Sequence, residues 1–155
     1  MKLKKWALIA EVISGAAVVV TLVFLVVGIR ENTSTTRAVA YANLIDSINE
    51  LESQRLNNSE LTANWRLFRT GQLSNIELDN RGQLALYVQM LARNYEKAYY
   101  SNLYGIIGAD EWERFERSIC ILYADTQAVG FGTFSPDFRA ISASFGEYVR
   151  QSCGE

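Results

Sequence analysis

A run of 23 small or apolar residues, interrupted by one acidic residue, extends from Ala7 to Ile29. As an α-helix this run would be about 34 Å long, enough to cross a hydrocarbon core of roughly 30 Å. Trp6 precedes the run where an interfacial aromatic residue belongs, and basic side chains flank both ends: Lys2, Lys4, Lys5 and Arg30. The sequence therefore predicts a basic flank (1–6), a transmembrane helix (7–29) and a helical domain (30–155).

A secretory signal peptide is the alternative interpretation of this segment, because the chain begins basic and then becomes apolar. The run is longer than the roughly 7–15 apolar residues of a signal peptide, and no A-x-A-like cleavage site follows it. We therefore expect an uncleaved anchor with the lipid bilayer as its partner. Three lysines precede the run, whereas two basic residues, Arg30 and Arg37, follow it. This excess of positive charge before the run favours an exported domain.

One face of the expected membrane helix is suited to helix association. Small residues recur along this face at spacings of four, three and four, at Ala10, Ser14, Ala17 and Thr21. Glu11 lies at the edge of the face. Small residues let helix backbones approach, and hydroxyl or carboxyl groups can hydrogen-bond between helices. An acidic residue inside a membrane is also a candidate for ion transport. Because Glu11 lies near one end of the run, it can equally reach the headgroups or pair with a flanking lysine.

The chain beyond the anchor reads as helix almost throughout. Apolar residues repeat at helical spacing in four stretches: Tyr41, Leu44, Ile48 and Leu51; Leu61, Trp65 and Phe68; Leu84, Val88, Leu91, Tyr95 and Tyr99; and Trp112, Phe115, Ile119 and Leu122. A fifth set, Phe138, Ile141, Phe145 and Tyr148, follows Ser135-Pro136, a favourable helix start. The fold class expected is all-α, with four or five helices packed as a bundle.

Polar and glycine residues place the expected boundaries between these helices. The anchor helix is expected to continue to about Leu56, and any break in it falls at Asn32-Thr33-Ser34. Asn57-Asn58-Ser59 predicts a turn and a helix cap, and Gly71 a helix stop. A long helix is expected from about Asn75 to Tyr104, followed by a break at Gly105 and Gly108 and a new helix capped by Asp110.

The composition excludes several kinds of site. The chain has no histidine, which rules out Ser-His-Asp and Cys-His nucleophile systems and His-based metal sites. The net charge is −2 for the chain and −4 from Arg30 onward, so a nucleic-acid partner is not expected. Cys120 and Cys153 are compatible with one disulfide outside the cytoplasm or with two buried thiols, and we favour the thiols.

Two clusters are candidates for ligand binding. Four tyrosines near the end of the long helix could line a pocket, although tyrosines at this spacing are more often core: Tyr95, Tyr99, Tyr100 and Tyr104. Carboxylates at 110–116 could suggest a divalent cation, but they are better explained as a solvated helix start that favours the macrodipole. Gly130-Phe131-Gly132 reads as a loop. We expect no catalytic residue, no metal and no cofactor, and therefore no enzyme.

Several short segments resemble an uncharacterised bacterial family of small single-pass membrane proteins. The matching segments are Trp6…Ala10-Glu11, Ala17-Val18-Val19-Val20-Thr21-Leu22, Arg30-x-Asn32-Thr33…Arg37-Ala38, Gly105…Gly108…Trp112 and Phe145…Tyr148-Val149. The resemblance implies an acid-containing membrane helix, an R-x-N-T segment and a helical domain in the bacterial inner membrane. Similar proteins carry fewer lysines before the anchor, which implies a cytoplasmic domain in them. The side of the membrane therefore stays open at this point.

The function expected from these features is a membrane-anchored helical interaction or scaffold protein. It would associate with its own copies or serve as an accessory subunit of a membrane complex. The alternatives are an oligomeric transport or channel component that uses Glu11, and a membrane-tethered ligand-sensing domain that uses the tyrosines.

Overall fold

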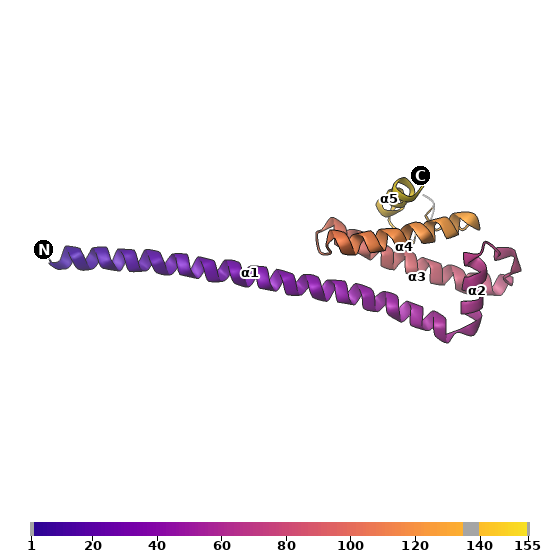
Figure 1. The fold of residues 1–155 in the computed structure, drawn as a ribbon, viewed down its shortest axis with the longest axis horizontal. Coiled ribbons are helices and arrows are strands. Elements are labelled where there is room, and N and C mark those ends of the chain that lie inside the picture. The colour runs from indigo at the N-terminus through magenta and orange to yellow at the C-terminus, as the bar shows by residue number, and fades with distance from the viewer. Residues whose placement is uncertain (1, 135–139, 155) are drawn as a thin grey trace. The chain divides into compact units, whose positions relative to one another are not determined.

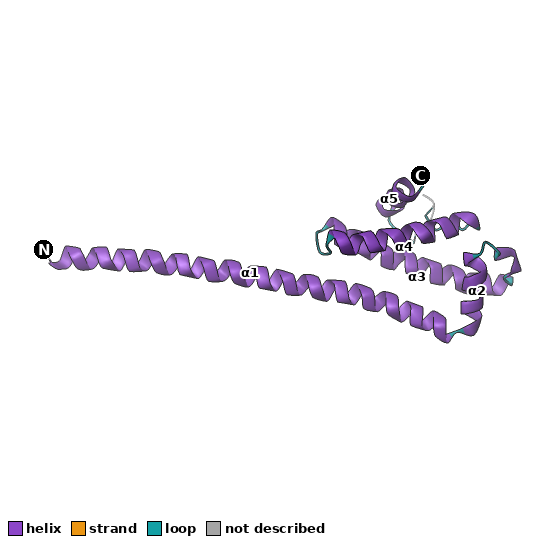
Figure 2. Cartoon of the chain, viewed as in Figure 1, coloured by secondary structure: helices purple, strands orange, loops and turns teal. Residues whose placement is uncertain are grey.

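The computed structural model describes residues 2–134 and 140–154, and the side chains of residues 2–10 and 12 lie outside the description. The described residues form helices and no strand, which confirms the all-α prediction (Figure 2). The chain divides into two units, Met1–Val39 and Ala40–Glu155.

The first unit consists of the amino-terminal part of helix α1 (Lys2–Asn57). Its apolar side chains from Ile13 to Ile29 are exposed, and Phe24 is the most exposed of them at 74%. By length and composition, α1 is able to cross a membrane.

Helix α1 has no break at the Asn-Thr-Ser segment, where the sequence allowed one. The threonine hydroxyls there donate to carbonyls four residues earlier in the same helix, instead of capping a new one. Thr33 Oγ1 lies 2.8 Å from the Ile29 carbonyl oxygen, and Thr36 Oγ1 lies 2.8 Å from that of Asn32. Such back-bonding is compatible with a helix interior, so the helix continues through the segment.

The second unit is a helical bundle. It contains the last turns of α1 and four further α-helices: α2 (Ser59–Arg69), α3 (Leu78–Leu103), α4 (Ala109–Ala128) and α5 (Ala143–Cys153). A short 3-10 helix, η1 (Leu73–Asn75), separates α2 from α3. Helix α3 packs against α2 and α4, and α4 packs against α5 (Figure 1). The end of α1 runs antiparallel to α3, since Ser47 bonds Asn94 while Glu52 bonds Tyr87.

The expected helical faces supply the core of this bundle. The most fully buried large side chains are Phe68 of α2, Leu84 and Val88 of α3, Ile119 of α4, Phe145 and Val149 of α5, and Phe134 of the α4–α5 connection. Asn58 caps α2 as predicted, because its side chain accepts a hydrogen bond from the Leu61 N–H at 2.9 Å. Gly71 and Gly105 follow α2 and α3 with φ values of 72° and 65°, which glycine adopts without strain.

The starts of α3 and α4 differ from the predicted positions, and the predicted start at Ser135-Pro136 lies outside the described residues. Gly108 is the residue before α4, so Asp110 lies in the first turn and does not cap the helix. Helix α5 begins at Ala143, where the Ser142 hydroxyl accepts a hydrogen bond from the Phe145 N–H at 3.3 Å. Residues 140–142 are not helical, while Ser135, Pro136 and Phe138 lie outside the described residues. The long helix α3 begins at Leu78, not near 75, because η1 and an extended Ile76 precede it.

Candidate functional site

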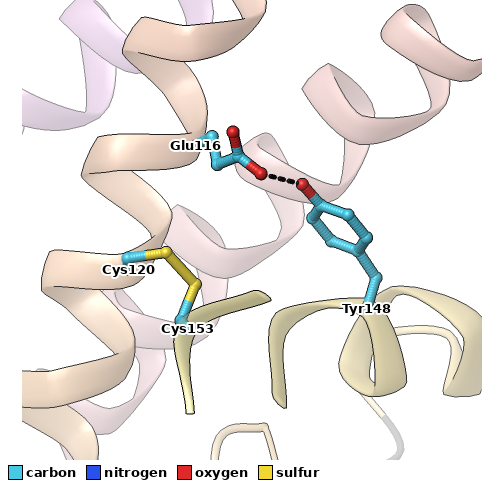
Figure 3. The surroundings of a disulfide bond; sticks show 4 residues. All are labelled: Glu116, Cys120, Tyr148 and Cys153. Atoms are coloured by element: carbon cyan, nitrogen blue, oxygen red, sulfur yellow. Dashed lines mark hydrogen bonds between the residues drawn. A yellow bond between two sulfur atoms is a disulfide. The ribbon is translucent and has the colours of Figure 1, made fainter. Parts of the chain in front are cut away.

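Cys120 and Cys153 form a disulfide that joins α4 to the end of α5 (Figure 3). The preference for two buried thiols is therefore wrong, because the end of α5 brings the Cα atom of Cys153 to 5.0 Å from that of Cys120. One turn before Cys120, Glu116 accepts a hydrogen bond from the Tyr148 hydroxyl. Burial, and then this hydrogen bond, raise the pKa of Tyr148 above its ordinary value. Two different links thus hold α5 against α4.

The four candidate tyrosines do not line one pocket. Tyr99 packs among aromatic rings of α4 and α5, with its centroid 4.9 Å from that of Tyr148. The Tyr100 hydroxyl lies 3.0 Å from the Ser142 hydroxyl and 2.9 Å from that of Ser144. Tyr104 is 71% exposed. Of the four, Tyr95 belongs to the lining of a pocket among the described helices.

That pocket, which we call the Arg–Trp pocket, has a volume of about 240 Å³ and lies among α1, α2, α3 and α4. Its wall combines four charged side chains, two aromatic residues, one hydroxyl and three aliphatic residues: Glu52, Arg55, Trp65, Arg69, Leu91, Tyr95, Ser118, Ile121, Leu122 and Asp125. Each helix contributes at least two of these residues. All of them belong to the second unit.

Two guanidinium groups lie near the ring of Trp65. The Cζ atom of Arg55 is 5.8 Å from the centre of the Trp65 ring, and that of Arg69 is 6.0 Å away. Both distances are within the range of cation–π attraction. Tyr87 packs edge-on against Trp65 at 5.1 Å, which helps to fix the indole.

Arg55 is held by Glu52, one turn earlier on α1. The Nε and Nη2 atoms of Arg55 lie 3.0 and 2.5 Å from Glu52 Oε2, while Oε1 accepts a hydrogen bond from Tyr87 at 2.5 Å. Burial lowers the pKa of Arg55, but hydrogen bonding and attraction to Glu52 together outweigh that effect and raise it. For Tyr87, burial and then Glu52 raise the pKa. Arg55 is therefore a permanent cation whose side chain is 14% exposed.

Asp125 of α4 pairs with Arg69 of α2 across the pocket. Arg69 Nε lies 2.7 Å from Asp125 Oδ2, yet within the described residues Oδ2 accepts no hydrogen bond. Burial raises the pKa of Asp125 and the Arg69 charge partly offsets that effect. Burial likewise raises the pKa of Tyr95. The Asp125 carboxylate is thus held in an ion pair with Arg69.

The membrane-helix candidates lie on α1 in the first unit. Glu11, Ser14, Ala17 and Thr21 are exposed on this helix, and the side chain of Ala10 lies outside the described residues. The Thr21 hydroxyl donates to the Ala17 carbonyl at 2.9 Å. It keeps its oxygen lone pairs for a donor from another helix.

Two of the carboxylates at 110–116 have side-chain partners. Glu113 pairs with Arg117 at 3.1 Å, and Glu116 accepts from Tyr148. Across the residues that the structure describes, no group of three or more His, Cys, Asp or Glu residues is placed to hold a metal ion.

Reasoning from the sequence missed the charged residues of the Arg–Trp pocket. The only local signal is the three-residue spacing of Glu52 and Arg55, which is common on solvated helix faces. The other charged residues come from α2 and α4, and only packing of the helices brings them together. No protein-family model matches the chain, and comparisons with curated proteins and with solved structures find no significant match.

Proposed function

We propose that this chain is a single-pass protein of the bacterial plasma membrane whose helical domain lies on the exported side. The observation that carries this proposal is the Cys120–Cys153 disulfide in the domain that follows the apolar helix. Disulfides persist in oxidising compartments and are rare in the cytoplasm. The excess of lysine before the anchor supports the same orientation.

The protein acts through contacts with other proteins in the membrane and carries out no catalysis. The face formed by Ser14, Ala17 and Thr21 supports association between membrane helices, with a second copy of the chain as the first partner to test. Glu11 lies beside this face, where a carboxyl group is able to bond across the interface.

The test is the oligomeric state of the full chain in mild detergent, measured by size exclusion with light scattering. Ser14→Leu and Ala17→Leu should dissociate the oligomer, because a larger side chain separates the backbones. Val19→Leu, on the other side of the same helix, is the matched control and should change nothing. A protein that is monomeric throughout would contradict self-association. Loss of pH-dependent ion flux in vesicles with Glu11→Gln would favour the transport alternative instead.

A second candidate function is the sensing of a small ligand by the exported domain. The observation in its favour is the Arg–Trp pocket, which four charged and two aromatic side chains line. The tyrosine cluster does not support it, since only Tyr95 lines that pocket.

A further inference from the structure

We propose that the Arg–Trp pocket binds a small zwitterion, an α-amino acid with an aliphatic or aromatic side chain. The ligand carboxylate would bond Arg55, and the ligand ammonium group would bond Asp125. This inference rests on the second candidate function and names the class of ligand.

The donor for the carboxylate is the unused end of Arg55. Glu52 occupies the Nε and Nη2 atoms of this guanidinium, and Nη1 has no hydrogen-bond partner among the described residues. Glu52 and Tyr87 hold the group in place, so little side-chain freedom is lost when a ligand binds. A planar guanidinium fixed in this way is suited to a carboxylate.

The acceptor for the ammonium group is Asp125. Its Oδ2 atom lies 2.7 Å from Arg69 Nε in an ion pair, but within the described residues it has no partner in hydrogen-bond geometry, and its side chain is 16% exposed. A ligand ammonium group would add a second cationic donor to this mostly buried carboxylate. The gain from binding is the charge-assisted hydrogen bond that this donor makes beside the Arg69 pair.

The charge of the pocket selects a zwitterion over a simple ion. Two arginines and two carboxylates line the pocket, so its formal charge is balanced. An anion would be attracted by Arg55 but repelled by Asp125. A cation would be attracted by Asp125 but repelled by Arg55. A molecule with both charges close together satisfies both residues at once.

Size and apolar lining restrict the ligand further. The volume of about 240 Å³ is below the roughly 300–1,000 Å³ of pockets for drug-sized molecules. It corresponds to about eight water molecules at roughly 30 Å³ each. Leu91, Ile121 and Leu122 add aliphatic side chains to a lining that is otherwise mainly polar or aromatic. A single amino acid with an apolar side chain matches this combination, whereas a peptide or nucleotide is too large.

The experiment is thermal unfolding of the full chain in mild detergent, followed by tryptophan fluorescence with millimolar ligand. The probes are L-valine, L-leucine, L-methionine and L-phenylalanine. At least one should raise the Tm by about 3–6 °C, since a ligand that binds only the folded state stabilises it. The matched derivatives of that amino acid, the N-acetyl compound without an ammonium group and the amide without a carboxylate, should give no shift. No shift with any of the four amino acids would overturn the proposal, as would an equal shift with the N-acetyl compound.

Two variants assign the binding to this pocket. Asp125→Asn should weaken binding about tenfold or more, through loss of the charged partner of the ammonium group. Glu113→Gln, which removes another acidic residue of α4 that pairs with an arginine, is the control and should bind as the wild type does. Ile121→Phe should block the pocket without changing any charge. Unchanged binding by both pocket variants would place the ligand elsewhere. Failure here leaves the oligomeric state and the membrane orientation unaffected, so the two proposals fail separately.

Discussion

Cys120, in the middle of α4, is bonded to Cys153, the last residue of α5. The two cysteines are 33 positions apart in the sequence, and the segment between them includes the α4–α5 connection and the whole of α5. A covalent link at this point limits the freedom of that segment in the unfolded chain. The link also holds α5, the helix that carries the buried side chains of Phe145 and Val149, against α4.

Removal of the disulfide should lower the free energy of unfolding by about 3–4 kcal/mol, the cost expected for releasing a loop of this length. The measurement is urea unfolding of the full chain in mild detergent, with and without reductant. After reduction, most of the helical circular dichroism signal should persist at low urea, because the helix that the disulfide fixes, α5, has only 11 residues. The Cys120→Ser/Cys153→Ser double variant should show the reduced stability and no further response to reductant. A wild type that unfolds identically with and without reductant would contradict the prediction.

The hydrogen bond from Tyr148 to Glu116 should make stability depend on alkaline pH. Its folded-state pKa lies above the ordinary value of 10.0, so the neutral phenol is favoured in the folded protein. This contribution is present below pH 10.0 and is lost as the pH rises through the raised value. Tyr148→Phe should lower stability by about 1 kcal/mol at neutral pH and flatten the alkaline loss. Tyr104→Phe, which changes a 71% exposed residue, should do neither.

Phe145 should be one of the most sensitive positions in the bundle. Its side chain is fully buried, with ring centroids 5.4 Å from Tyr99 and 6.1 Å from Phe134. Phe145→Ala should lower the free energy of unfolding by about 3–5 kcal/mol, because it leaves a cavity among these rings. Leu86→Ala provides the comparison: Leu86 is 61% exposed, and the change expected is about 0.5 kcal/mol or less. Equal effects of the two substitutions in urea unfolding would refute the packing described here.

Asp125 should produce a measurable pH dependence at mildly acidic pH. Burial, its main influence, raises the folded-state pKa above the ordinary value of 3.8, so the folded protein binds the proton more tightly than the unfolded chain. Stability contributed by this group therefore falls as the pH rises from 3.8 through the raised pKa. Asp125→Asn should remove that part of the profile. The measurement is the difference between wild-type and variant unfolding curves across this range, with Glu113→Gln as the control that leaves the profile unchanged.

The sequence predicts the helices of this fold better than it predicts the pocket. Apolar spacing identifies buried positions such as Ile119 and Leu122 because one helix determines which side chains share a face. The Ser135-Pro136 signal lies outside the described residues, and the structure begins α5 at Ala143 because the Ser142 side chain caps the helix there. The Arg–Trp pocket depends on how four helices pack, and no local spacing encodes that arrangement.

Membrane topology of the two cysteines tests the central claim most directly. Cells with a permeabilised outer membrane are treated with a membrane-impermeant maleimide, before or after an impermeant reductant, and parallel samples are denatured so that half-buried thiols react. A Cys120→Ser/Cys153→Ser variant that carries Glu113→Cys at an exposed position reports topology independently of the disulfide. An exported, disulfide-bonded domain predicts labelling of the wild type in unlysed cells only after reduction, and labelling of the Glu113→Cys variant without reduction. Labelling of both proteins only after lysis, with the wild type reactive in the absence of reductant, would place a reduced domain in the cytoplasm and contradict the account.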